Sequence, residues 1–187
     1  MDLASAEESK TVRFASGLAL AGICLALWSN FALNQTFIEV KRSVVGGLTV
    51  VEKIDSILEN LDSLTKNQRA FLSTGEAHFA EEVAESIMAI NHDLETLEQI
   101  SISRVPLQPY VSTLSYRVKM ALDSIRKTYD LQQNFGSGVA MAQLDNDDAV
   151  DAAKIEALAL KSAATDGMFD RVQTECCKIR SILEVLF

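Results

Sequence analysis

The chain has 187 residues, of which 48% are hydrophobic, and its formal net charge is −9 at pH 7. This length predicts one domain plus an anchor, and the negative charge argues against nucleic acid and against binding of the soluble part to an anionic membrane surface. The sequence contains no Gly-rich phosphate loop and no cluster of cysteine and histidine at metal-ligand spacing. We therefore expect no cofactor and no metal.

The N-terminal segment divides into a short polar tail, residues 1–13, and an apolar stretch. From Phe14 to Ile38 the sequence carries no charged residue. About 20 helical residues, at about 1.5 Å each, cover the hydrocarbon thickness of a bilayer. We therefore predict a transmembrane anchor at residues 14–35. The alternative is a cleaved signal peptide, but no convincing small-x-small cleavage site follows the apolar run.

The anchor is expected to continue directly into the first helix of a bundle. Basic residues stand on both sides of the predicted span, namely Lys10, Arg13, Lys41 and Arg42. Because positive charge flanks both ends, it does not decide the orientation.

Gly46 and Gly47 lie just beyond the span and predict either a soft juxtamembrane joint or a point of close packing against another helix.

Apolar residues at alternating steps of three and four mark the first two bundle helices. In the first helix they are Ile54, Ile57, Leu61, Leu64, then Gln68 and Phe71. In the second they are Ala80, Val83, Ile87, Ile90, Leu94 and Leu97. Between the two series, Gly75 can take the left-handed conformation that ends a helix. Residues 67–76 are therefore predicted to form the tip of a helical hairpin.

Gln68 is a polar residue on this otherwise apolar seam. A buried polar side chain costs stability unless it finds hydrogen-bond partners. Gln68 therefore either belongs to a polar layer that fixes the helix register or has a functional role. Arg69 points off the seam, where it can meet a carboxylate or a neighbouring chain.

Residues 68–76, Gln-Arg-Ala-Phe-Leu-Ser-Thr-Gly-Glu, resemble the Gln-Arg-Gly-aromatic-Leu-Leu-Thr-Gly-acid signature of the third type of CHASE domain. The matching positions are Gln68, Arg69, Phe71, Leu72, Thr74 and Gly75. Ala70 replaces the usual glycine, and Ser73 replaces the usual apolar residue or threonine. The resemblance covers about residues 36–180.

CHASE domains are extracytoplasmic sensor domains of bacterial histidine kinases, nucleotide cyclases and chemoreceptors. They are four-helix bundles flanked by membrane spans. The resemblance therefore implies a single-pass protein of the bacterial inner membrane. Its N-terminus would lie in the cytoplasm, and its bundle in the periplasm or outside the cell.

The remaining helices follow from the same periodicity. The second helix has acidic residues that predict a solvated outer face, namely Glu81, Glu82, Glu85, Asp93, Glu95 and Glu98. After a break at Pro106 and Pro109, the third helix has a continuous seam, namely Leu107, Val111, Leu114, Val118, Ala121, Ile125 and Thr128. The next turn falls either at residues 136–138 or at residues 145–148, and we prefer the second.

The last helix is predicted from about residue 148, with a weak spot at residues 163–167. Its seam residues are Ile155, Leu158, Phe169, Val172, Cys176 and Ile179. The fold class is therefore all-α, with an N-terminal transmembrane helix that continues into an antiparallel four-helix bundle at residues 36–182. Residues 183–187, Leu-Glu-Val-Leu-Phe, look like half of a protease site used to remove tags, so we expect them to be a tag remnant.

The three cysteines do not form a disulfide framework, because Cys176 and Cys177 are adjacent and a bridge between neighbours is strained. Cys24 lies inside the apolar stretch. Cys177 is the candidate for a bond between chains.

The leading hypothesis is a membrane-anchored sensory or protein-interaction bundle, in which a ligand or partner displaces the helices. Gln68 and Arg69 would then set bundle packing or pairing. The alternative is a single-span scaffold that assembles with itself or with a partner membrane protein. An enzyme is not expected, because the two histidines and the adjacent cysteines supply no recognisable nucleophile, base or metal site. No small-molecule ligand is identified by the sequence.

Overall fold

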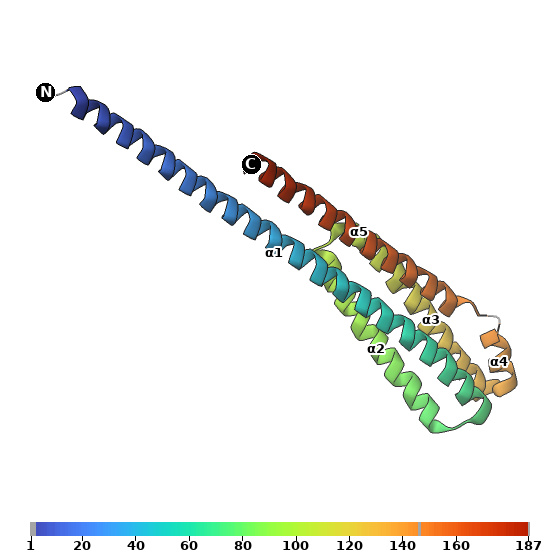
Figure 1. Cartoon of the computed structure of the whole chain (residues 1–187). Helices are drawn as coiled ribbons and strands as arrows, with labels where there is room; N and C mark the ends of the chain where they lie inside the picture. Colours follow the sequence, from blue (N-terminus) through green and yellow to red (C-terminus); the bar gives the residue numbers. More distant parts are fainter. Residues whose placement is uncertain (1–2, 146, 187) are drawn as a thin grey trace. The chain divides into compact units, whose positions relative to one another are not determined.

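The structure is a computed structural model that describes residues 3–145 and 147–186, without the side chains of 3–15, 18, 182, 183, 185 and 186. The elements in chain order are α1 (Leu3–Thr74), α2 (Ala77–Ile102), the short 3₁₀ helix η1 (Val105–Leu107), α3 (Gln108–Phe135), α4 (Ser137–Asp145) and α5 (Ala149–Leu186) (Figure 1). Over these described residues no strand occurs. The predicted all-α class is confirmed.

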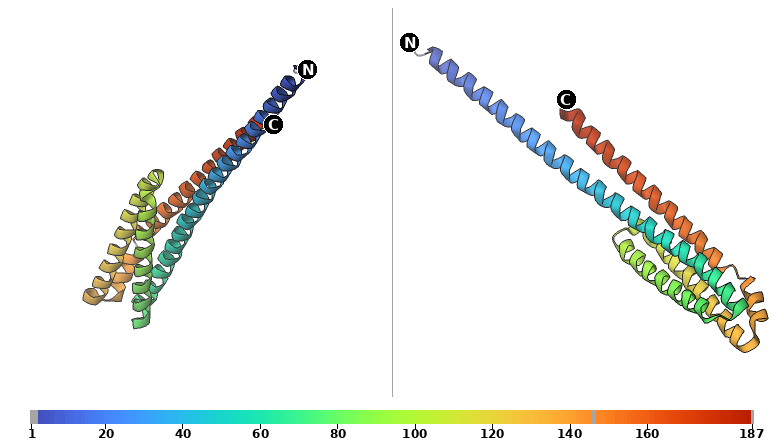
Figure 2. Two further views of the ribbon diagram at one scale, coloured as in Figure 1. Left: turned by 90° about the vertical axis from the view of Figure 1, so that its left-hand side faces the viewer. Right: turned by 60° about the horizontal axis from the view of Figure 1, so that its bottom comes forward.

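The chain divides into two compact units. The first unit is Met1–Val44 with Asp170–Phe187, and the second unit is Val45–Phe169. Both α1 and α5 continue from one unit into the other without a break in the helix. Figure 2 shows the helices from two further sides.

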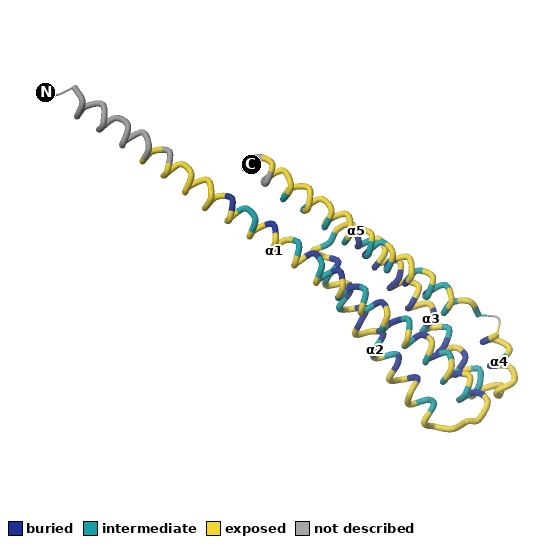
Figure 3. The backbone as a smooth tube through the Cα atoms, in the orientation of Figure 1, coloured by how far each residue is buried: buried dark blue, intermediate teal, exposed yellow. Residues whose placement is uncertain are grey.

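The second unit is a four-helix bundle made by α1, α2, α3 and α5. Its larger core cluster contains residues of all four helices, and buried positions recur along them (Figure 3). Lys154 and Lys161 of α5 pair with Asp62 and Asp55 of α1, each at 2.5 Å. Because the residue number rises along one helix as it falls along the other, α1 and α5 are antiparallel.

The seams predicted for α1, α2 and α3 supply most of the core of the bundle, although Ala80 lines a groove instead. Ile54, Ile57, Leu61 and Leu64 are each 0% exposed. All seven seam residues predicted for the third helix are buried, from Leu107, which ends η1, to Thr128 on α3. These helices carry large apolar residues on one face, so hydrophobic periodicity finds that face directly.

The helix ends confirm the predicted tip. Gly75 has φ +73°, and its N–H donates to the carbonyl oxygen of Phe71 at 2.8 Å. The end of α3 is set in the same way by Gly136, with φ +86°. The chain breaks at both of the two predicted turn positions, with the short α4 between them, so the preference for residues 145–148 alone was wrong.

The predicted seam of α5 was wrong. Ile155, Leu158 and Phe169 are 66%, 54% and 64% exposed, and Cys176 is exposed as well. The residues that enter the core are Ala153, Ala157, Leu160 and Ala164. A helix that buries alanine presents a smooth face to its neighbours, and a count of large apolar residues overlooks it. The helix also continues without interruption through the predicted weak spot at residues 163–167.

Asp93 was predicted on the acidic outer face of α2, and this was also wrong. It is 4% exposed, and it accepts a hydrogen bond of 2.9 Å from Nζ of Lys53 on α1. That hydrogen bond raises the pKa of Lys53 above its ordinary value. A paired carboxylate can be buried, whereas an unpaired one cannot.

Candidate functional site

Gln68 lies in the core of the second unit, between two groups of apolar side chains. It is 0% exposed. On α1 it follows Leu64, a member of the larger core cluster, and precedes Leu72, which belongs to a smaller cluster with Ala140 and Leu144 of α4. The side chain of Gln68 therefore occupies the boundary between the two clusters.

The amide of Gln68 is buried without a hydrogen-bond partner. Among the described residues, neither its Oε1 nor its Nε2 finds a donor or acceptor. On α3, Thr128 follows Ile125 of the larger cluster and precedes Leu131, which packs against the smaller one; it is 1% exposed and its hydroxyl donates to the carbonyl oxygen of Ser124. An unpaired buried amide costs about 1–3 kcal/mol. The bundle therefore carries a local energetic cost at this layer.

The neighbouring motif residues have contacts that explain them locally. Arg69 is exposed and lies 3.4 Å from Asp145 of α4, an exposed pair that contributes little stability. Phe71 packs its ring against that of Tyr129 on α3, with the centroids 5.0 Å apart. Leu72 is buried, and the hydroxyl of Thr74 accepts from the N–H of Glu76 at 3.2 Å.

A groove of about 610 Å³ opens between α2 and α3. Small residues of α2, Ala80 and Ala84, line it together with Arg126 and Tyr129 of α3. The groove was not predicted from the sequence. Ala80 and Ala84 leave room for it, but the buried seam of α5 also consists largely of alanine, so such residues do not signal a groove in the sequence.

Tyr129 joins this groove to α1. Its side chain lines the groove, and its ring is the one that packs on Phe71. Its hydroxyl is buried without a partner among the described residues. Burial raises the pKa of Tyr129, so the hydroxyl remains a hydrogen-bond donor at neutral pH.

The glycine pair on α1 lies at a point of close approach. A methyl group on Gly46 would meet the guanidinium group of Arg104, and one on Gly47 would lie 3.1 Å from Sδ of Met168. The helix continues through both residues. Of the two predicted roles, close packing therefore fits the contacts better than a soft joint.

The first unit has its small polar residues buried and its large apolar residues exposed. Ser29, Thr36 and Ser43, seven residues apart on α1, are 6%, 9% and 9% exposed. The exposed apolar side chains of the same segment are Leu20, Ile23, Leu25, Leu27, Trp28, Phe31, Phe37 and Ile38. The second unit has the opposite arrangement, because its large apolar side chains are mostly buried.

An ion pair on α5 lies within the first unit. Lys178 donates to Oε1 of Glu175 at 2.6 Å. This hydrogen bond raises the pKa of Lys178, and the charge of Glu39 on α1 adds to the effect. All three cysteines are exposed and free, including Cys177, the candidate for a bond between chains.

No helix of the described part contains an apolar stretch long enough to cross a membrane. The predicted anchor at residues 14–35 includes Phe14, Ala15 and Leu18, whose side chains lie outside the described residues. Residues 1 and 2 of the predicted polar tail lie outside them too, as does residue 187 of the predicted tag remnant. Among the residues that the structure describes, no group of three metal-ligating side chains occurs.

Comparisons of the chain with protein-family models, with characterised proteins and with solved structures found no match.

Proposed function

We propose that this protein is a membrane-anchored sensory bundle of the third CHASE type. In this proposal α1 crosses the bacterial inner membrane at residues 14–35, with the N-terminus in the cytoplasm and the bundle outside. A ligand or partner that prefers one packing of the bundle displaces the helices by shifting the equilibrium between two packings. The free energy of that shift equals the difference between its binding free energies for the two packings. The observation that carries the proposal is that α1 is one uninterrupted helix from Leu3 to Thr74.

This helix joins two regions with different properties. At one end it exposes large apolar side chains and buries serine and threonine. Small and hydroxyl-bearing residues are typical of contacts between helices in membranes, where the lipid solvates the apolar surface. Large contiguous apolar surfaces are rare on soluble monomers. The segment is therefore better suited to lipid than to water.

At the other end the same helix carries the unpaired amide of Gln68. A packing that gave this amide a partner would recover part of its desolvation cost. The energy gap between the observed packing and such an alternative is thereby reduced. A sensor needs a small energy gap between its two packings, because a ligand of moderate affinity can shift only an equilibrium between states of similar energy.

The alternative is a scaffold that assembles from several copies of the chain. It is favoured by the exposed apolar side chains of α5 in the second unit, which lie at Ile155, Leu158 and Phe169. They form a stripe on the side of α5 opposite its alanine seam. Cys177 is exposed and available to report contact between copies.

The native cysteines test the membrane topology. We consider two variants of the full chain in bacterial cells, one with Cys24 alone (Cys176→Ser, Cys177→Ser) and one with Cys176 and Cys177 alone (Cys24→Ser). A membrane-impermeant maleimide should label the second variant in intact cells and should not label the first. A Ser5→Cys variant without other cysteines should be labelled only after lysis.

Labelling of Cys176 and Cys177 only in lysed cells would contradict the proposed orientation. Release of the chain by alkaline carbonate extraction would contradict the anchor itself. To separate sensor from scaffold, the mass of the chain in lipid nanodiscs can be measured by light scattering, with Cys177→Ser as a cross-linking control. A monomer or weak dimer supports the sensor, and a discrete assembly of many copies supports the scaffold.

A further inference from the structure

We infer that the groove between α2 and α3 is a binding site for a small amphipathic anion, with one carboxylate on an apolar aromatic or aliphatic body. The groove lies entirely within the second unit. Its volume of about 610 Å³ is in the range of small-molecule sites in proteins.

The floor of the groove suits an apolar body. Val83 and Ile125, which are 3% exposed, lie at its base, and the small side chains of Ala80 and Ala84 leave the space above them open. The ring of Tyr129 forms part of the wall. A ligand placed here removes apolar surface from water on both partners.

The rim of the groove suits an anionic head. Lys119 and Arg126 of α3 both line it, in a chain whose net charge is −9. They are seven residues apart, about 10.5 Å along a helix, with Asp123 between them. Asp123 lies 3.9 Å from Arg126, and both side chains are largely exposed. Such a loose pair leaves the guanidinium able to bind a carboxylate in a charge-assisted, bidentate contact.

The hydroxyl of Tyr129 is an unpaired polar group behind the wall of the groove. It is buried there, and the described residues offer it no partner. A ligand oxygen would reach it only if the ring of Tyr129 shifted, and the ligand would then satisfy a group that has no described partner in the observed packing.

Occupation of the groove would act on α1 through one contact. The ring of Tyr129 packs on Phe71, which lies three residues beyond Gln68 on the same helix. A ligand that repositions Tyr129 therefore changes the packing beside the unpaired amide. This consequence depends on the proposed sensory function, whereas binding itself does not.

The test uses the full chain in phosphatidylcholine nanodiscs, with naphthalene-2-carboxylate as the probe. Naphthalene-2-carboxamide serves as its neutral counterpart. Calorimetry should show saturable binding of the carboxylate and binding of the amide weaker by about tenfold, the usual effect of a charge-assisted contact at a partly exposed site. The double variant Lys119→Gln/Arg126→Gln should lose affinity for the carboxylate by a similar factor.

Two matched controls make the test specific. Arg117→Gln/Lys127→Gln removes the same charge from exposed positions of α3 outside the groove and should change the affinity by less than about twofold. Ala84→Trp fills the groove from an exposed position and should abolish binding, whereas Met88→Trp, one turn further along α2, should not.

Equal binding of the neutral amide, equal losses in the two glutamine double variants, or retention of binding in Ala84→Trp would each overturn the site. So would binding that weakens as the chain concentration rises, because a second copy would then occupy the groove. If binding is absent while the cysteine labelling supports the topology, this inference fails and the proposed function stands.

Discussion

Two buried polar side chains of the bundle are in opposite situations. Asp93 is buried with Lys53 as its partner, and Gln68 is buried with none among the described residues. The first arrangement is common in folded proteins, and the second is rare enough to require a reason. At the scale of the residue, the two make opposite predictions for replacement by an apolar side chain.

We expect Gln68→Leu to stabilise the bundle. The substitution keeps a similar volume and removes an unpaired amide from the core, so the free energy of unfolding should rise by about 1–2 kcal/mol. Thermal unfolding of the full chain followed by circular dichroism measures the change. The control is Gln99→Leu on the exposed side of α2, where the change should stay within about 0.5 kcal/mol. A loss of stability in Gln68→Leu alone would show that the amide is satisfied in solution.

The Lys53–Asp93 pair should make stability depend on alkaline pH. The pKa of Lys53 is raised in the fold above 10.5, chiefly by its hydrogen bond to Asp93. The contribution of the pair to the free energy of unfolding is therefore complete below the pKa that Lys53 has in the unfolded chain. It is lost as the pH rises through the pKa of Lys53 in the fold. The stability difference between the wild type and Lys53→Met/Asp93→Leu should change in this direction between about pH 9 and pH 11.5. If stability fell with pH equally steeply in the wild type and the double variant, the prediction would be wrong. The Tyr129→Phe variant is the control for the ionisation of Tyr129 at alkaline pH.

At the scale of the element, helix ends and seams differ in how well the sequence predicts them. The end of α1 follows from one glycine, because φ +73° at Gly75 is a conformation that other residues adopt only at a cost. The seams of α1, α2 and α3 follow from their large apolar residues. The seam of α5 does not, because alanine is common on exposed and buried helix faces alike and gives no periodic contrast.

Two glycines with open surroundings give a contrasting pair of substitutions. No atom lies within 4 Å of an added Cβ at Gly75 or at Gly167. Gly75→Ala should destabilise the fold by about 1–2 kcal/mol, because alanine resists a positive φ. Gly167→Ala, inside α5, should stabilise it by about 0.5–1 kcal/mol. The midpoints of thermal unfolding of the two variants measure these changes in stability. If both variants were stabilised or both destabilised, backbone conformation would not be the cause.

At the scale of the whole molecule, the sequence predicts Gln68 as a candidate residue and misses the groove. A motif is contiguous and can be recognised along one helix. The groove needs Ala84 from α2 and Arg126 from α3, and only their distance in space makes them a site. The pairing of Asp93 was missed for the same reason, because its lysine is forty residues away on α1.

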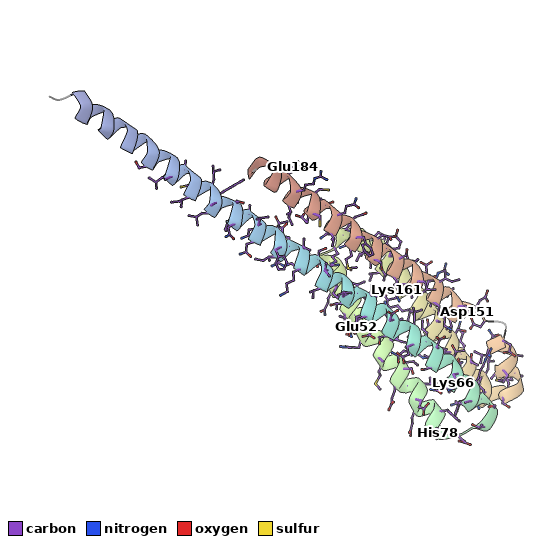
Figure 4. All side chains as sticks on the ribbon, in the orientation of Figure 1. Glu52, Lys66, His78, Asp151, Lys161 and Glu184 are labelled. Atoms are coloured by element: carbon purple, nitrogen blue, oxygen red, sulfur yellow. The ribbon has the colours of Figure 1, made fainter. Side chains whose placement is uncertain are left out.

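The ion pairs between α1 and α5 have a further consequence for movement along the bundle. Lys154 and Lys161 form ion pairs with Asp62 and Asp55. On α1, Glu52 and Lys66 stand at exposed positions (Figure 4), and Glu59 is exposed as well. A screw step of three residues, about 4.5 Å with a turn of about 60°, would bring the two lysines to Glu59 and Glu52 if α5 moves towards its own C-terminus. A step of four residues in the opposite sense would bring Lys154 towards Lys66 and Lys161 towards Glu59. The charges therefore favour one direction of movement, in which both lysines meet new carboxylates, over the other, in which Lys161 meets a carboxylate and Lys154 meets another lysine.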